Sequence, residues 1–258
     1  YFLADNARIV VVGKGSEVAE NLEKLSYKGK KIPVKYFDKD GKEIKKPVFK
    51  MSVDAGVTPE KVFNDYFKAI GGKEAVEAVK STVYKASAEI QGQKLEMEVK
   101  LSADGKLAQL VSMGGMVVQK QVFDGETGYN MVQGQKMPYT EENIATAKAE
   151  AHPFPELIAK DATVEGIEPV NGEDAYVVKV SEDTRNYYSV DSGLKLQSVK
   201  TVTQGPQTMS IPTTFSDYKE VNGILFPFTI TVSMGPQPLS FKVSEVKVNE
   251  GVSASDFE

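Results

Sequence analysis

Few residues of this chain could carry out acid–base, nucleophilic or metal chemistry. His152 is the only histidine, and there is no cysteine. Zinc sites built from two histidines or from thiolates, and a cysteine nucleophile, are therefore excluded. His152 lies between Ala151 and Pro153 in a proline-bounded junction, which favours a solvated loop residue over a general base. We expect no catalytic residue and no metal site in this chain, so the sequence points to binding or to a structural role.

A glycine-containing turn and two acidic pairs are the remaining candidates for chemistry. Val12-Gly13-Lys14-Gly15-Ser16 follows an apolar run, where a dinucleotide fingerprint would lie, but position 18 is valine instead of the third glycine. Glu141-Glu142 falls in the first turn of an expected helix, where acidic side chains favour the helix dipole. Glu182-Asp183 flanks a hairpin turn. We interpret all three as structural, and not as a nucleotide site or as glycosidase carboxylates.

The two parts of the 258-residue chain differ in charge. Residues 1–57 contain 12 Lys and Arg against 8 Asp and Glu, whereas the rest contains 19 against 28. This change of sign supports a domain boundary, and the acidic larger part argues against a nucleic-acid partner, which requires a basic footprint. No apolar run approaches the ~18 residues that would indicate a transmembrane segment. We therefore expect two domains, over residues 1–47 and 58–258, joined by a linker at 48–57.

The first domain is expected to be a small βαβ unit. Residues 8–13 have the apolar character of a buried parallel strand, a helix follows from Ser16, and residues 32–37 form a second strand before a turn at 38–41. About 45 residues in this arrangement cannot bury both faces alone.

The second domain begins with a helix and continues as an antiparallel sheet. Thr58-Pro59 is a typical helix start, and an apolar stripe (Val62, Phe63, Tyr66, Phe67 and Ile70) follows at helical spacing. From Thr82 onward the period is two: Leu95, Met97, Val99 and Leu101 alternate with Lys94, Glu96, Glu98 and Lys100. Similar segments recur to residue 248, separated by turns such as Gln91-Gly92 and Asn222-Gly223. So many strands with few helices predict one strongly curved sheet. The expected class is α+β: the βαβ fragment plus a large antiparallel half-barrel covered by helices, with the stripe on its concave side.

Methionines are concentrated in the β region, which holds seven of the eight. Methionine is flexible and polarizable, so it suits a cavity for varied apolar ligands, although it also fills ordinary cores. Neighbouring hairpins could bring several such residues together around an acyl chain. The candidate ligand-binding residues are Phe67, Met113, Met116, Val118, Phe123, Tyr129 and Met131.

Residues 4–47 carry a resemblance to a family of peptidases. From Ala4-Asp5-Asn6-Ala7-Arg8 through Tyr36-Phe37-Asp38-Lys39-Asp40-Gly41 to Pro47, the segment resembles the extreme C-terminus of Bacteroidetes pitrilysin/insulinase-type zinc peptidases. The catalytic His-x-x-Glu-His motif of that family is absent. The resemblance implies a non-catalytic C-terminal fragment, with zinc expected only in an upstream part of a parent protein. Because the chain begins at Tyr1, we interpret it as a processed or truncated product.

Residues 58–258 carry a second resemblance. Phe67-Lys68-Ala69-Ile70-Gly71-Gly72, Tyr188-Ser189-Val190-Asp191-Ser192-Gly193 and Phe215-Ser216-Asp217-Tyr218 are similar to segments of LolA/LolB-type lipoprotein carriers. The resemblance implies a half-barrel that shelters acyl chains, and a periplasmic or cell-envelope location. We therefore expect a domain that binds an apolar or lipid-type ligand. The alternative is a docking domain that positions the peptidase on a partner or substrate. The possible partners of the chain are upstream peptidase domains or another envelope protein.

Overall fold

The computed structural model describes residues 8–13, 15–38, 41–46, 53–204, 207–235 and 237–258. The chain divides into two compact units, residues 1–52 and 53–258, which are described separately.

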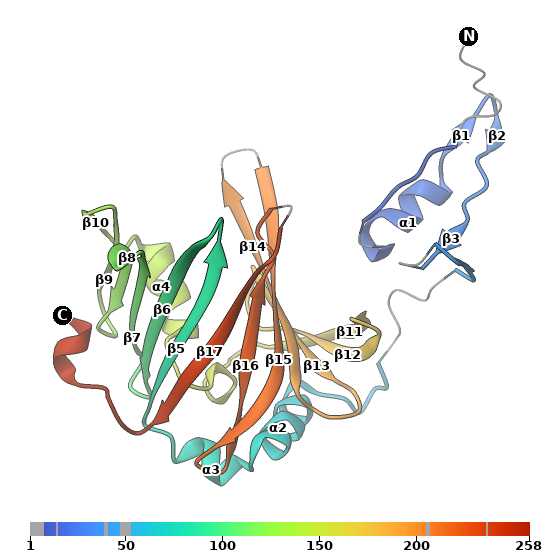
Figure 1. Ribbon diagram of the computed structural model, residues 1–258. Coiled ribbons are helices and arrows are strands. Elements are labelled where there is room, and N and C mark those ends of the chain that lie inside the picture. Colours follow the sequence, from blue (N-terminus) through green and yellow to red (C-terminus); the bar gives the residue numbers. More distant parts are fainter. Residues whose placement is uncertain (1–7, 14, 39–40, 47–52, 205–206, 236) are drawn as a thin grey trace. The chain divides into compact units, whose positions relative to one another are not determined.

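The larger unit is built on one antiparallel sheet of 13 strands (Figure 1). Strands adjacent in sequence pair as hairpins, and β5 pairs with the last strand, β17, so both halves of the chain join in the middle of the sheet. The order across the sheet is β10-β9-β8-β7-β6-β5-β17-β16-β15-β14-β13-β12-β11. The strands are β5 Ser81–Ile90, β6 Gln93–Ser102, β7 Lys106–Met113, β8 Met116–Phe123, β9 Gly128–Val132, β10 Gln135–Pro138, β11 Thr163–Val170, β12 Glu173–Lys179, β13 Thr184–Ser189, β14 Lys195–Gln204, β15 Gln207–Val221, β16 Ile224–Val232 and β17 Leu239–Val248.

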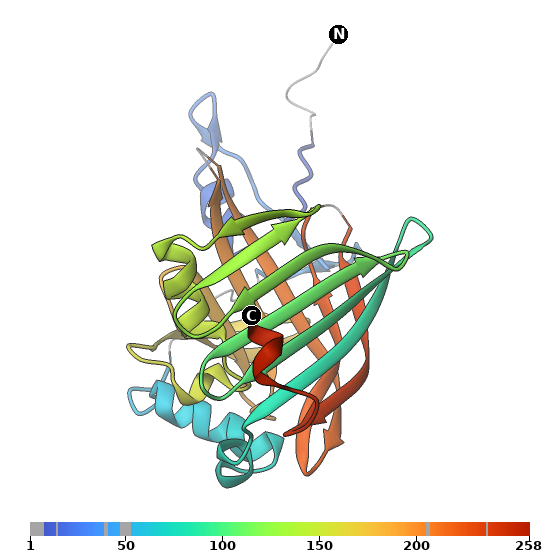
Figure 2. The same cartoon turned by 90° about the vertical axis from the view of Figure 1, so that its left-hand side faces the viewer.

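The sheet is strongly curved, and the helical segments before β5 and between β10 and β11 lie on its concave side (Figures 1 and 2). The predicted stripe of α2 (Pro59–Ile70) is buried in the main core, together with Ala86 of β5 and Phe226 of β16, so its expected packing is confirmed. Thr58 caps this helix by accepting a hydrogen bond from the backbone N–H of Lys61 at 3.3 Å. The other helical segments are α3 Lys73–Glu77, α4 Glu141–Glu150 and the short 3₁₀ helices η2 Pro155–Leu157 and η3 Ala254–Phe257.

The strand register confirms the predicted alternation along β6. Residues directly opposite one another in an antiparallel pair share a face. Met97 lies opposite Ala86, which belongs to the interior cluster, and Glu98 lies opposite Lys85. The apolar set from Leu95 to Leu101 therefore faces the concave side, and the charged set from Lys94 to Lys100 faces outward.

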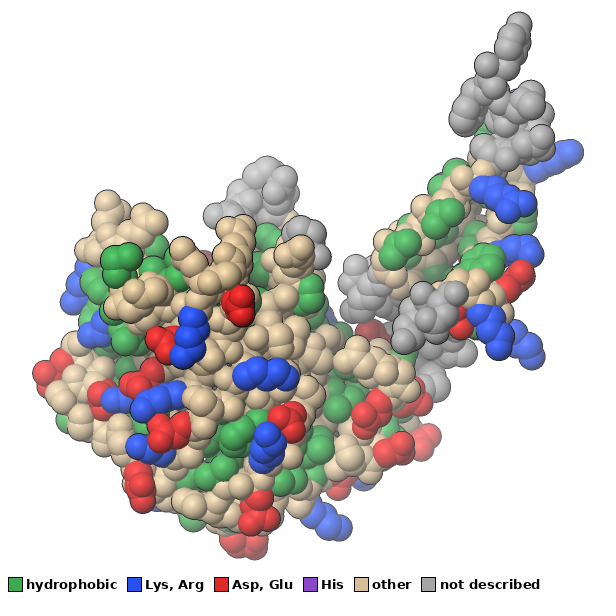
Figure 3. Space-filling model, viewed as in Figure 1, with side chains coloured by type: hydrophobic (Ala, Val, Ile, Leu, Met, Phe, Trp, Pro, Cys, Tyr) green, Lys and Arg blue, Asp and Glu red, His purple; other side chains and the backbone are tan. Residues whose placement is uncertain are grey.

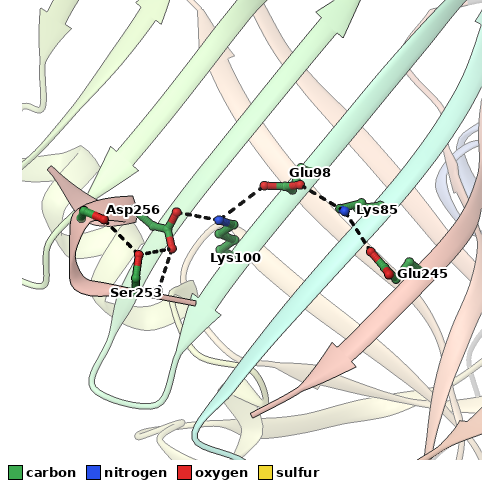
Figure 4. A network of polar contacts seen from close by, with 7 residues as sticks. Lys85, Glu98, Lys100, Glu245, Ser253 and Asp256 are labelled. Atoms are coloured by element: carbon green, nitrogen blue, oxygen red, sulfur yellow. Dashed lines mark hydrogen bonds and ion pairs between the residues drawn. The ribbon is translucent and has the colours of Figure 1, made fainter. Parts of the chain in front are cut away.

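An ion-pair network crosses the outer, convex face and reaches the C-terminal segment (Figure 4). Lys85 Nζ lies 2.9 Å from Glu245 and 3.9 Å from Glu98, and Lys100 Nζ lies 3.6 Å from Glu98. Lys100 continues the network to Asp256 of η3, at 2.5 Å. This segment also buries Phe257, so part of the convex face is covered by the end of the chain.

The smaller unit corrects the expected fold class. Its helix, α1 (Gly15–Glu23), is accompanied by two short antiparallel pairs: β1 Ser26–Tyr27 with β2 Lys30–Lys31, and β3 Tyr36–Phe37 with β4 Glu43–Ile44. Residues 8–13 form no strand, and Ile9 to Val12 are exposed. The α+β class with a βαβ fragment is wrong, because a buried parallel strand needs neighbours that the described residues of this unit do not supply. The structure is instead dominated by the open antiparallel sheet with few helices.

Gly71, which ends α2, provides a test of how this helix is seated on the sheet. Its φ is +134°, and a Cβ atom added there would lie 2.3 Å from the carbonyl oxygen of Gly223 in the β15–β16 turn. We expect Gly71→Ala to lower the free energy of unfolding by more than about 1 kcal/mol in urea denaturation. Gly92→Ala is the control, because Gly92 also has a positive φ, +77°, but faces open space. Equal losses in the two variants would contradict a steric role for Gly71.

Candidate functional site

The concave face changes from a closed core at one end to a more exposed apolar surface at the other. Around α2 the interior side chains are buried. Toward the opposite end, the concave side chains of the strands are only half-buried, although most are large and apolar. In strand order these are Met113, Leu95, Met97, Leu239, Val232, Ile230, Phe215 and Ile211. A half-buried apolar concave surface is what an apolar ligand would need.

The segment between β10 and β11 crosses this concave face as a strap, defined here as residues 139–157. At one end, the Tyr139 ring stacks on Phe123 of β8, with centroids 6.0 Å apart. Further along, Glu150 accepts from Lys200 Nζ of β14 at 2.7 Å. The Phe154 ring then lies 5.9 Å from that of Phe226 in the core. The strap therefore contacts both arms of the curved sheet and limits how the concavity can be entered.

A buried ion pair anchors the far end of the strap. Glu156 Oε1 accepts from Lys195 Nζ of β14 at 2.9 Å and from the Tyr188 hydroxyl of β13 at 2.7 Å. The Glu156 side chain is 3% exposed and that of Lys195 is 16% exposed. Burial alone would raise the pKa of Glu156, but the Lys195 charge and the hydrogen bonds from Lys195 and Tyr188 outweigh it, so the pKa is lowered. Glu156 is therefore ionised and paired inside the domain.

Tyrosines surround this pair and stay neutral. Burial, the Glu156 charge and the hydrogen bond to Glu156 raise the pKa of Tyr188 well above its usual value. Burial likewise raises the pKa of Tyr66 and Tyr84. Next to Tyr188, the buried Oδ1 of Asn186 has no hydrogen-bond partner among the described residues. A lone acid in the apolar run Phe154-Pro155-Glu156-Leu157-Ile158 was the sequence signal for this cluster, which sequence reasoning missed.

The candidate ligand-binding residues do not form one patch. Met113 lies opposite Leu95 on the concave face, and Met116 is opposite Met113 at the tip of the β7–β8 hairpin, 73% exposed. Phe123 is also concave but is buried under the strap.

Tyr129 and Met131 are on the opposite, convex face. They pair with Val122 and Lys120, and the Tyr129 hydroxyl donates to the backbone oxygen of Glu258 in the C-terminal segment at 3.2 Å. Val118 is the extra residue of a bulge in β8. Phe67 belongs to the closed core around α2. Of the candidate set, Met113 and Met116 are left near the exposed part of the concavity, and their ligand-binding role stays a prediction.

His152 requires a correction. It is 7% exposed, and its Nδ1 accepts a hydrogen bond from the backbone N–H of Phe154 at 3.0 Å. Burial lowers its pKa. The expectation of a solvated loop residue is therefore wrong: His152 shapes the turn of the strap. Among the described residues, no group of three or more His, Cys, Asp or Glu could hold a metal ion.

A separate cleft of about 420 Å³ lies between α2 and the β13–β14 turn. Its walls carry Lys61, Asp65 and Lys68 from the helix and Asp191 from the turn. Lys61 Nζ already pairs with Asp65 at 2.6 Å, so this cleft is polar and partly self-neutralised. It has a different character from the apolar concave face.

Comparisons with known proteins identify the fold of the larger unit. No protein-family model matches the chain, and no curated protein matches it. Among solved structures, a LolA superfamily protein from Nitrosomonas europaea superposes with a TM-score of 0.55, at 10% identity, over 79% of this chain and 98% of that one. The larger unit thus has the LolA-type half-barrel fold.

Two further structures have lower scores. A putative outer membrane lipoprotein-sorting protein domain from Vibrio parahaemolyticus gives a TM-score of 0.49, at 11% identity, over 77% of this chain and 97% of that one. A DUF1329 family protein from Desulfovibrio piger gives 0.48, at 13% identity, over 77% and 96%. Nothing in these comparisons supports the resemblance of residues 4–47 to pitrilysin/insulinase-type peptidases. In the part of the chain that the structure describes, no helix combines the length and the apolar character needed to span a membrane.

Proposed function

We propose that the larger unit binds an apolar, acyl-type ligand on the exposed part of its concave face, within the cell envelope. The observation that carries this proposal is the half-buried apolar surface around Met113, Leu95 and Met97. Leu95 and Met97 pack against the edge of the closed core and remain partly exposed. A carrier needs apolar side chains that an acyl chain can reach. The LolA-type fold supports the ligand class and the location by analogy of fold.

Two methionines on opposite faces of the same sheet allow a matched test. Met113 faces the concavity and Met131 faces outward, and both are half-buried. We expect the full chain to bind a fluorescent fatty acid, and Met113→Glu to weaken that binding about tenfold, because a carboxylate would be placed against the acyl chain. Met131→Glu introduces the same charge and should leave the affinity within about twofold. Absence of probe binding by the wild-type chain, or equal losses in both variants, would reject the proposal.

The smaller unit supports a second candidate function, docking to another polypeptide. Ile9 to Val12 form an exposed apolar run that is covered by nothing else in the described part of this unit. Exposed apolar patches of this kind mark association sites. Attachment to a zinc-peptidase parent, with zinc bound only upstream, is one form of this hypothesis. An upstream His-x-x-Glu-His sequence in the full-length polypeptide would support it, and an upstream sequence without that motif would remove it.

A further inference from the structure

Exposed apolar side chains of the larger unit gather at one end of the sheet. Six hairpins turn toward this end. Five of them follow one another from the β10 edge of the sheet: β9–β10, β7–β8, β5–β6, β16–β17 and β14–β15. The sixth, β12–β13, comes next along the sheet. Ten large apolar residues are exposed in the described part of the larger unit, and eight of them lie at or near these five turns. They are Ile90, Met116, Val117, Val132, Met137, Val202, Met209 and Met234. We call this set the apolar rim.

The rim has an unusual charge composition. The five turn segments, residues 90–94, 113–118, 132–138, 202–209 and 232–239, contain no Asp or Glu and only two lysines, Lys94 and Lys136. The chain as a whole is 26% charged and has a net charge of −5. Figure 3 agrees: the acidic side chains visible in that view lie below the upper edge of the larger unit. Acids are thus missing from the five turns where apolar side chains are exposed. The sixth turn, β12–β13, carries Glu182 and Asp183 and has no exposed large apolar residue among those described.

The rim fits a lipid surface better than a protein partner. Its side chains come singly or in pairs from separate turns. Met116 and Met234 are 73% and 61% exposed. A protein partner would require a continuous, shaped patch, whereas shallow insertion into a bilayer interface requires only several apolar tips in one layer. Gln, Ser and Thr between the tips can hydrogen-bond to lipid headgroups. The lack of acids in these five turns limits repulsion from anionic lipids, and the two lysines add attraction.

We propose that the apolar rim docks the larger unit on the surface of an anionic phospholipid bilayer. The rim borders the exposed part of the concave face, since Met116 lies opposite Met113 and Val202 lies opposite Met209 on its concave strands. Docking in this way would bring the open end of the half-barrel to the lipid. The inference does not depend on ligand binding in the concavity, because a rim can insert whether or not the interior is filled.

The test is sedimentation of the full, ligand-free chain with vesicles of phosphatidylcholine and phosphatidylglycerol in equal amounts. We expect the triple variant Met116→Gln/Met209→Gln/Met234→Gln to bind at least about tenfold more weakly, because glutamine keeps the size and neutrality of methionine but removes its apolar character. The control is Ile158→Gln/Val190→Gln, which changes the other two exposed large apolar residues in the described part of the larger unit. It should bind within about twofold of the wild type.

The proposal would be overturned by no vesicle binding of the wild-type chain, by unchanged binding of the triple variant, or by equal losses in both variants. A wild-type dimer in sedimentation analysis that the triple variant dissociates would assign the rim to a second copy of the chain, and would also overturn it. Circular dichroism checks that each variant is folded. Fatty-acid binding measured without vesicles reports on the concave face alone, so the two proposals fail independently.

Discussion

Replacing Phe67 with alanine should lower the free energy of unfolding by ~3–5 kcal/mol, measured by urea denaturation followed by circular dichroism. Phe67 is 3% exposed in the core between α2 and the concave face. Removing its ring loses the transfer free energy of the buried carbons and leaves a cavity that the surrounding strands can fill only in part. The sheet is one continuous hydrogen-bonded array, so its strands can move only a little to fill the cavity.

Lys68→Ala is the control for this substitution. Lys68 is the next residue of the same helix and is exposed, so the change tests helix propensity without opening a cavity. It should alter stability by no more than about 0.5 kcal/mol. A loss of that small size for Phe67→Ala itself would mean that the stripe of α2 is not packed on the sheet.

The strands and turns of the larger unit could be predicted because their signals are local. Alternation with a period of two along residues 94–101 gives both the strand and its faces. Turn pairs such as Asn222-Gly223 have positive φ at both residues, 53° and 80°, which these residue types adopt most easily. Strands joined by such tight turns must pair with their neighbours, and a long chain of hairpins must curve.

The placement of the candidate residues on the two faces could not be predicted, because the face of a side chain depends on register. Phe123 lies opposite Gly128, so Tyr129, one residue further along, points to the other face. The four-residue connection between β8 and β9 sets this parity, and periodicity within either strand does not reveal it. Bulges, as between Val111 and Ser112, shift the parity again with no distinctive residue to mark them. For these reasons a plausible set of apolar residues was divided between the two faces.

The smaller unit shows the limit of short apolar runs. Ile9-Val10-Val11-Val12 has the composition of a buried strand, but a strand is defined by its partners. The described residues of this unit pair only as Ser26–Tyr27 with Lys30–Lys31 and as Tyr36–Phe37 with Glu43–Ile44. The composition therefore indicates a tendency to be covered, and the described residues of the unit do not supply the cover.

Glu156 could not be found from sequence spacing, because its partners come from strands 32 and 39 residues further along the chain. Its substitution gives the second large expected effect. Glu156→Leu should lower the free energy of unfolding by about 3 kcal/mol, since it leaves the buried Lys195 ammonium and the Tyr188 hydroxyl without their acceptor. The double variant Glu156→Leu/Lys195→Met removes both charges at similar volume and should recover most of that loss. A single variant as stable as the wild type would show that the pair contributes nothing to stability.

The same pair predicts a dependence of stability on pH with a definite sign. The pKa of Glu156 is lower in the folded protein than in the unfolded chain, where a glutamate has a pKa of about 4.3. Below that value the unfolded state binds a proton that the folded state still excludes, so acid favours unfolding. The contribution of Glu156 is therefore complete above about pH 5 and is lost as the pH falls through the folded-state pKa.

Many other carboxylates titrate in this range, so the wild type must be compared with the double variant. The wild type should lose stability more steeply than the double variant between about pH 5 and pH 3 in urea titrations. Parallel pH profiles would mean that Glu156 titrates alike in both states, and its bonds to Lys195 and Tyr188 would then have no net effect on its ionisation.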